Sequence, residues 1–490
     1  MSAALIATLG ALLSAGADST RVVTPAEIAT LRNAQETAHG QIEALDQKIK
    51  VLERLRENDQ EDAAAAAKSA VKPQANAGGF WIRSADSAYA IRFRGIVRSG
   101  ANWDLDDEND KTLDQFQNTN VRFGFDGVLG KSLEFKINSD WSKGAVALQD
   151  AYLDIKYSSW LKARVGKFQV PLEWERFVSP SDLLFYDRAF PAQIGPNRDV
   201  GAQLFGSLAS DRVQYSVGVF NGGADNSNIN GDSNDDKDVY GRLWLTPLKG
   251  VSDLAGNLGI GFAANAGFHT NGTPSGYKST SGNAFFSWKA ADSLNGIGYR
   301  LAPQAQWTYG PILAFGEWIQ SVQDIKRGAT VVATDSVGTA AANKGLVYRY
   351  NKTTAGVEGA ELSNSAWQAA LSWVITGEDA NVAGVSPRHP FNPSTGDLGA
   401  FEISARISGL SVDDKAFANA NFADSTASAR SALAYGASLN WHLIKGSRLQ
   451  IGYERTDFTD GAAVDPAAKT KVVRDRKSEN QLFVIASTSF

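Results

Sequence analysis

The chain has 490 residues, of which 43% are hydrophobic and 21% charged, and its formal net charge is −5. The lack of cysteine excludes disulfides, thiol catalysis and cysteine-bound metals, and the acidic balance argues against nucleic acid as a partner. No run of 18 consecutive apolar residues occurs, which excludes an ordinary transmembrane helix. A barrel of membrane-spanning strands would also lack such a run, because each strand exposes every second residue to lipid and the others to water.

The first residues have the pattern of a secretory signal peptide, which we predict over residues 1–17. An apolar run over residues 3–13 is followed by the small-x-small sequence Ala15-Gly16-Ala17. No Lys or Arg precedes the run, and a buried N-terminal helix is the alternative. The pattern nevertheless favours export from the cytoplasm.

A different period follows, and it predicts a coiled-coil helix over residues 24–58. Apolar residues recur at alternating spacings of three and four, while charged residues lie off that seam. A single amphipathic helix packed on another surface is the alternative. Residues 59–79 are small and polar, and we predict that they form a linker. The a and d positions are Ile28, Leu31, Gln35, Ala38, Ile42, Leu45, Ile49 and Leu52.

From about residue 80 the period changes to two, which predicts β-strands with two different faces. In residues 89–103 one face is apolar and aromatic and the other is basic and polar. Because a soluble sandwich also alternates, a soluble carbohydrate-binding sandwich stays open at this point. The apolar face carries Tyr89, Ile91, Phe93, Val97, Ala101 and Trp103. The polar face carries Arg92, Arg94, Arg98 and Asn102.

The lengths of the connections favour a membrane barrel, because short turns alternate with long polar loops. This pattern predicts about sixteen antiparallel strands over residues 80–490. The last of them, residues 481–490, would pair with the first and remove the sheet edges. One connection that should be short, residues 377–398, is long. Short turns fall near Gly130, Ser158, Ser210, Gly310 and Lys445. Long loops are predicted at 104–118, 221–237, 270–296, 327–363, 412–430 and 459–478.

Several motifs in residues 88–490 resemble the phosphate- and polyphosphate-selective porins (porin O/P) of Gram-negative outer membranes. The resemblance implies a sixteen-stranded homotrimer, with the third long loop, residues 170–197, folded inward to narrow the pore. It does not include the coiled coil, which we expect in the periplasm. The motifs are Gly166-Lys167-Phe168-Gln169-Val170-Pro171, Ser179-Pro180-Ser181, Phe185-Tyr186-Asp187-Arg188, Gln149-Asp150-Ala151-Tyr152, Arg198-Asp199-Val200-Gly201, the run 372–378, Gly399-Ala400-Phe401-Glu402 with Ala405-Arg406, and Leu439-Asn440-Trp441.

Arginines on the inward faces are the candidate functional residues. A guanidinium stays charged and matches phosphate oxygens in a planar fork, and successive arginines would pass an anion from site to site. A wet lumen with scattered, balanced charges is the alternative. The predicted lumen-wall residues are Arg92, Arg94, Arg98 and Arg122. With the inward loop that the resemblance implies, the constriction candidates are Arg176, Asp187, Arg188 and Arg198.

Two positions depart from the phosphate-specific pattern of the family. Gly95 is followed by Ile96 where the family has an arginine, and Val121 stands beside Arg122 where a second arginine is expected. The hypothesis is therefore a porin for small anions such as phosphate. A general small-solute porin without phosphate specificity, and a non-conducting structural or adhesive barrel, remain alternatives.

The sequence gives no sign of an enzyme. Gly130-Lys131-Ser132 ends like a phosphate-binding loop, but Phe125 occupies the position of its required first glycine. The four histidines lack metal-ligand spacing, and a solvated acidic loop explains the aspartates between residues 225 and 238 better than a cation site does. We expect no cofactor and no metal. The expected partners are small anions, outer-membrane lipid and lipopolysaccharide, and two further copies of the chain.

Overall fold

The computed structural model describes residues 24–69, 71–76, 79–106, 114–232, 234–328, 330–336, 348–354, 356–418, 422–463 and 473–490. The predicted signal peptide lies outside these described residues. The chain divides into two compact units, one holding helix α2 (Pro25–Ser69) and the other holding the barrel strands. Within the described residues, no helix is both long and apolar enough to span a membrane.

Helix α2 begins with a capping box. The backbone N–H of Glu27 donates to Thr24 Oγ1 over 3.4 Å, and the N–H of Thr24 donates to Glu27 Oε2 over 3.0 Å. Pro25, which has no N–H to leave unpaired, holds the first helical position. The helix continues to Ser69, so the predicted linker 59–79 is wrong in its first half. Five successive alanines over residues 63–67, the residue type with the highest helix propensity, explain the extension.

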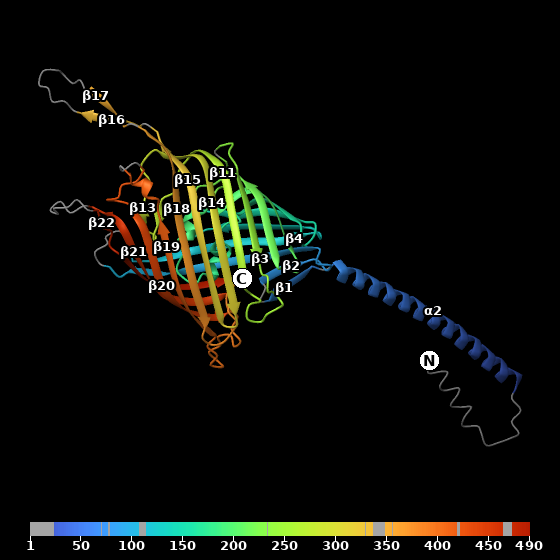
Figure 1. Ribbon diagram of the computed structural model, residues 1–490. Coiled ribbons are helices and arrows are strands. Elements are labelled where there is room, and N and C mark those ends of the chain that lie inside the picture. The colour runs from blue at the N-terminus through green and yellow to red at the C-terminus, as the bar shows by residue number, and fades with distance from the viewer. Residues whose placement is uncertain are drawn as a thin grey trace. The chain divides into compact units, whose positions relative to one another are not determined.

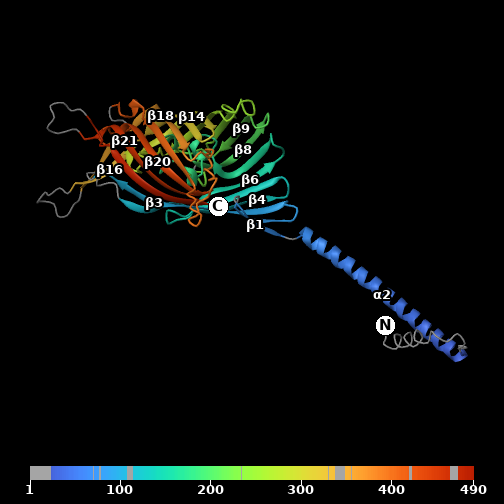
Figure 2. The ribbon, with the colours of Figure 1, turned by 90° about the horizontal axis from the view of Figure 1, so that it is seen from below.

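Sixteen antiparallel strands of the described chain close into a barrel, as predicted (Figure 1). The last strand, β23 (Glu479–Ser489), pairs with the first, β3 (Tyr89–Asp104), and Figure 2 shows the continuous curved wall. The others are β4 (Gln115–Leu129), β5 (Leu133–Asp140), β6 (Ala147–Lys156), β7 (Lys162–Gln169), β8 (Arg198–Leu208), β9 (Val213–Phe220), β10 (Asp238–Leu245), β11 (Gly259–Gly272), β14 (Asp292–Tyr309), β15 (Ile312–Arg327), β18 (Val357–Val374), β19 (Ala400–Ser411), β20 (Ala429–Ile444) and β21 (Ser447–Ala462).

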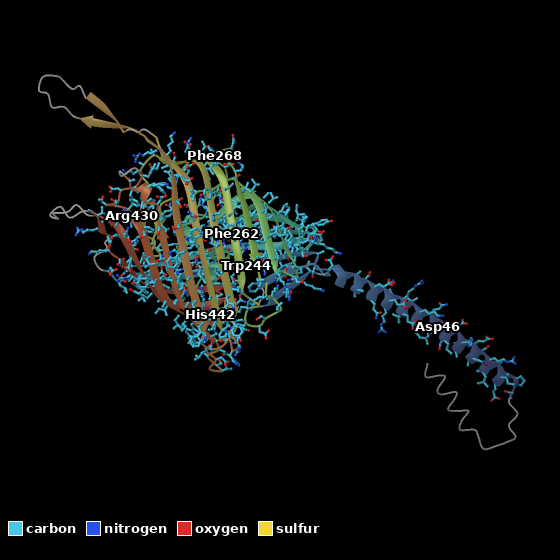
Figure 3. The ribbon with its side chains drawn as sticks, viewed as in Figure 1. Asp46, Trp244, Phe262, Phe268, Arg430 and His442 are labelled. Atoms are coloured by element: carbon cyan, nitrogen blue, oxygen red, sulfur yellow. The ribbon has the colours of Figure 1, made fainter. Side chains whose placement is uncertain are left out.

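Alternation along each strand separates an apolar outer face from a polar inner face. On β11, for example, Phe262 and Phe268 are each 50% exposed on the outside of the wall (Figure 3). Asn265, an odd number of residues from both, is buried and bonds to Asp238. Because apolar groups gain by leaving water and polar groups do not, the outer face suits lipid and the inner face suits a wet or hydrogen-bonded interior.

The chain end completes the closure of the barrel. Phe490 and Gly95 exchange two backbone hydrogen bonds of 3.1 Å, and the Phe490 ring lies edge-on to Phe80 at 5.7 Å. A Cβ on Gly95 would lie 2.2 Å from that ring, so the position needs glycine. Phe80 belongs to β2 (Gly79–Arg83), which pairs with β3 beyond the end of β23 and with β1 (Lys72–Asn76).

Short turns and long connections alternate as predicted except at 141–146, which is short, and at 246–258 and 375–399, which are long. Three of the long loops carry strands of their own, among them β22 (Arg474–Asp475) in the loop after β21. The connection of β14 to β15 is residues 310–311 and that of β20 to β21 is 445–446. The loop after β11 holds β12 (Tyr277–Lys278) and β13 (Ala284–Phe286), and the loop after β15 holds β16 (Thr330–Ser336) and β17 (Tyr348–Thr354). The long connection 375–399 between β18 and β19 is present as the sequence indicated.

Candidate functional site

The loop of residues 170–197, between β7 and β8, folds into the barrel and is bonded to the inner wall. The backbone N–H of Trp174 donates to Glu317 Oε2 of β15 over 2.7 Å. Ser438 of β20 and Gln450 of β21 both donate to the carbonyl of Leu184, each over 2.6 Å. Buried carbonyls need donors, and the polar inner face of the wall supplies them. The loop is thus fixed against the wall on the side of β14 to β23.

Arg98 serves this attachment and does not line open space as the sequence predicted. Its guanidinium donates to Phe185 O of the loop over 2.8 Å and to Thr119 Oγ1 over 3.2 Å, and the residue is 2% exposed. It lies on the same face of β3 as Arg94, whose side chain is 45% exposed. The loop therefore covers Arg98, whereas the side chain of Arg94 stays open to the interior of the barrel.

Two cavities remain between the loop and the wall on the side of β3 to β10. The first has a volume of about 550 Å³ and the second about 540 Å³. They share Lys136, Asp150 and Arg198, so they adjoin. Lys445 of a short turn lines the first, and Asp211 of another short turn lines the second, so both reach the short-turn end of the barrel. The predicted residues that line the first cavity are Arg92, Arg94, Arg122, Arg176, Arg188 and Arg198.

The arginines of the wall outnumber the carboxylates that pair with them. Arg92 Nη2 lies 2.9 Å from Asp126 Oδ2, and Arg94 pairs with the same carboxylate. Arg122 Nε lies 2.9 Å from Asp140 Oδ2. These pairs hold the guanidiniums in place along the wall. Because Arg92 and Arg94 share the single carboxylate of Asp126, the three side chains together have a net charge of about +1.

The same sharing occurs on β6, where two cations converge on Asp150. Arg198 Nε lies 2.9 Å and Lys136 Nζ 3.1 Å from its two oxygens. In the loop, Arg176 Nε lies 3.3 Å from Glu173 Oε2. Burial raises the pKa of Glu173 to about 8, so at neutral pH this carboxyl carries little charge. Arg176 therefore adds to the positive charge of the first cavity.

Asp187 and Arg188 are adjacent in sequence but have different surroundings. The exposed Asp187 carboxylate accepts from the N–H of Arg188 over 2.7 Å and lines neither cavity. The Arg188 guanidinium donates to the carbonyls of Val178 (2.7 Å) and Glu175 (3.3 Å). Burial lowers the pKa of Arg188 to about 10, which leaves it protonated at neutral pH. Of the two, Arg188 alone contributes charge to the first cavity.

The cavities carry a net positive lining. Eleven cationic side chains line one or both of them, against seven carboxylates that line them or pair directly with those cations. The chain as a whole is acidic, at −5, so the positive charge is concentrated here. A low-dielectric wall strengthens the effect of such an excess on mobile ions.

Five of these cations were not among the residues predicted from the sequence, namely Lys136, Lys162, Arg164, Arg242 and Lys445. Arg164 forms two hydrogen bonds, of 2.6 and 2.7 Å, with Asp154. Lys445 lies in the turn between β20 and β21, and the other four lie on β5, β7 and β10, in the wall that the loop leaves uncovered. The same alternation that selected the arginines of β3 runs through these strands and would have found those four.

The structure also bears on the cation site considered for the acidic loop. Asp225 is buried and pairs with Arg300 Nη2 over 2.7 Å, while Asp232 pairs with Lys237 Nζ over 2.6 Å. No group of three or more metal-binding side chains occurs among the described residues. The acidic loop is therefore used for ion pairs within the protein.

Comparison with known proteins gives one family and a set of similar structures. The family model described as "Phosphate-selective porin O and P" matches residues 91–474. No curated protein sequence matches. The outer membrane channel DcaP of Acinetobacter baumannii is 14% identical, with a TM-score of 0.49, over 84% of this chain and 99% of that one. OmpT of Vibrio cholerae in its trimer form is 10% identical, with a TM-score of 0.48, over 82% and 100%. OmpF of Salmonella typhi in complex with daunomycin is 12% identical, with a TM-score of 0.47, over 86% and 100%.

Proposed function

Because the chain belongs to the phosphate-selective porin O and P family, we propose that it is a passive outer-membrane porin whose lumen admits small anions in preference to cations. The observation that carries the proposal is the excess of cationic over anionic side chains around the two cavities. Since Ile96 and Val121 replace arginines of the phosphate-specific pattern, the proposed substrates are small anions in general, phosphate among them. Diffusion down a gradient needs no catalytic group and no cofactor.

The mechanism follows from electrostatics at close range. An anion that leaves water loses hydration, and fixed guanidiniums replace part of it with charge-assisted hydrogen bonds. Shared carboxylates such as Asp126 and Asp150 weaken each guanidinium's hold, which allows the anion to leave again. Between the two cavities, Arg198 lines both and would pass an anion from one to the other.

The test is the reversal potential of single channels in a potassium chloride gradient. We expect wild-type channels to prefer chloride over potassium. Replacing Arg94 and Arg122 together by glutamine is expected to lower the chloride-to-potassium permeability ratio about threefold or more at low salt, because two of the fixed charges within a Debye length of the path are lost. The effect should shrink as salt rises and screens the remaining charges.

The matched control removes a positive charge elsewhere on the barrel. Arg430, near the start of β20, pairs with Asp414 and Asp460 and lines neither cavity (Figure 3). Arg430→Gln should leave the reversal potential near the wild-type value. A cation preference in the wild-type protein, or equal shifts in both variants, would overturn the proposed anion path.

A non-conducting barrel is the second candidate, and one observation favours it. Aromatic side chains of several loops and of the inner wall pack together into one buried cluster. Phe190 contacts Phe285, which in turn contacts Phe458 of β21, with ring centroids 5.9 and 5.6 Å apart. The same single-channel recordings separate the two functions, since a structural barrel would give no conductance steps.

We also propose a homotrimer, supported by the unequal height of the barrel wall. Strands β5, β7, β9 and β10 have 8 residues each, whereas β14 and β18 have 18. Eight residues at about 3.3 Å, tilted by about 40°, rise only about 20 Å, less than the apolar band of about 25 Å that such barrels expose. Lipid would then meet polar connections, whereas a neighbouring copy would cover them.

The N-terminal helix is proposed as a periplasmic coiled coil of the three copies. Its apolar a and d side chains are uncovered within the described chain, with Ile42 62% and Leu52 64% exposed. At 45 residues the helix is about 68 Å long, enough for the four heptads and more. An apolar seam of this length is stable in water only when another helix covers it.

Deleting residues 20–60 should therefore lower the temperature at which the oligomer dissociates while leaving single-channel conductance within about 20% of the wild-type value. The physical reason is that the coil adds apolar contacts between copies but no pore lining. Oligomer dissociation followed by gel mobility against temperature measures the first effect and bilayer recordings the second. An unchanged dissociation temperature would show that the coiled coil does not stabilise the oligomer. A large loss of conductance would show that the deleted segment contributes to the pore.

A further inference from the structure

More aromatic side chains line the second cavity than the first, which has Phe490 and Phe177, the latter shared by both cavities. Phe177 of the loop and Tyr152, Phe168, Phe205 and Tyr215 of the wall all contribute to it. Phe177 is 49% exposed, and Phe205 and Tyr152 are partly exposed. A pore that passes only hydrated inorganic ions has no use for exposed rings, because such ions gain nothing from an apolar face. The rings thus indicate a ligand with an apolar part.

The cations of this cavity are placed against those rings. The Arg164 guanidinium lies 3.9 Å from the centroid of the Tyr152 ring and 5.1 Å from that of Phe205. The Arg242 guanidinium lies 4.9 Å from the Phe177 ring. These distances fall within the range of cation–π contact. Positive charge and aromatic surface are therefore presented together and not in separate regions.

Arg242 differs in its partners from Arg164 and Arg198, the other arginines of the second cavity. Within the described residues its guanidinium forms no ion pair with a carboxylate, and it donates to the neutral Gln304 Oε1 over 3.1 and 3.3 Å. Arg164, in contrast, is paired with the Asp154 carboxylate through Nε and Nη2. A partly buried guanidinium without a carboxylate can bind an external one at full charge.

We propose that the second cavity binds organic anions that carry a planar aromatic ring, with the carboxylate at Arg242 and the ring against Phe177 and Phe205. The inference rests on the proposed porin function and adds a substrate class to it. The volume of about 540 Å³ is far larger than a phosphate ion needs and lies within the range of sites for small organic ligands. Ring stacking and the charge then act on the same molecule, which inorganic anions cannot exploit.

The experiment compares benzoate with acetate as blockers of the chloride current through the wild-type channel. The two anions have the same charge and the same carboxylate and differ in the ring. We expect benzoate to reach half-block at a concentration at least about tenfold lower than acetate, because stacking on one or two rings has an effect of that size. Equal half-blocking concentrations would overturn the proposal, and this comparison needs no variant.

Variants locate the effect. Phe177→Leu keeps an apolar side chain but removes the ring, and Arg242→Gln removes the charge. Each should move the acetate-to-benzoate ratio of half-blocking concentrations toward one. Phe262→Leu, at an outward ring of β11, is the matched control and should leave that ratio unchanged (Figure 3). A ratio insensitive to both cavity variants would place benzoate elsewhere and overturn the assignment.

The outcome is separable from that of the porin proposal. If the channel prefers chloride but is blocked equally by benzoate and acetate, the anion pathway is supported and only the aromatic site is overturned. A channel without anion preference removes the pathway on which the site depends. Both readings come from the same recordings, because the reversal potential is measured before the blocker is added.

Discussion

Replacing Gly100 by valine is expected to abolish assembly of the barrel. Gly100 lies in β3 opposite Ile485 of β23, at the seam that closes the sheet. A Cβ at this position would lie 2.1 Å from the carbonyl oxygen of Val484 and 2.9 Å from the Cα of Ile485. Both are backbone atoms, so the strands must separate to make room. An open seam exposes unpaired N–H and C=O groups to lipid, each at a cost of several kcal/mol.

The measurement is the yield of heat-modifiable protein in outer membranes, since a closed barrel migrates differently before and after boiling. Gly241→Val is the matched control, because nothing lies within 4 Å of a Cβ built on Gly241 in β10. The control should assemble at near the wild-type yield. Normal assembly of Gly100→Val would mean that the seam is looser than its geometry indicates.

The barrel was predictable because its physics is local and repeated. Alternation of apolar and polar residues fixes two faces, and alternation of short turns with long loops fixes the strand count. Closure by the last strand could also be predicted from the sequence, since an even number of antiparallel strands lets the last strand pair antiparallel with the first. The glycine contacts at the seam did not follow, because the approach of Phe490 to Gly95 depends on register across the whole ring.

The end of the helix was missed for a different reason. Residues 59–69 lack the heptad pattern, and the loss of that pattern suggested a linker. A helix, however, needs only residues that tolerate it, and alanine does so better than any other. The pattern therefore predicted where a coiled coil ends, whereas the helix itself ends at Ser69, eleven residues later than predicted.

The depth at which each candidate arginine lies could not be predicted from the sequence. Arg94 and Arg98 lie on one face of β3, yet only Arg94 keeps an exposed side chain. The difference comes from Phe185, whose carbonyl accepts from Arg98 across 87 residues of sequence. Alternation says nothing of such contacts. For the same reason the aromatic cavity could not be foreseen, because it joins Phe177 of the loop to Arg242 of a distant strand.

Replacing Arg406 by methionine is expected to lower the free energy of unfolding by about 3–5 kcal/mol, the usual cost of leaving a buried charge without its partner. Arg406 is 4% exposed on β19 and lies 2.7 Å from Glu454 Oε2 and 3.6 Å from Glu175 Oε1. It also donates to the carbonyl of Asp187 over 2.9 Å, so it ties the inward loop to the wall. Its loss should free this part of the loop and raise single-channel conductance.

Two further variants decide whether burial and pairing cause the effect. Arg430→Met removes another paired arginine, but its side chain is 41% exposed, and such surface pairs contribute only about 0–1 kcal/mol. Adding Glu454→Gln to Arg406→Met should restore part of the lost stability, because the orphaned carboxylate becomes neutral. Thermal unfolding in detergent measures all three. If Arg406→Met and Arg430→Met unfold at the same temperature, the buried arginine does not hold the loop of residues 170–197 against the wall. Other contacts would then have to fix that loop.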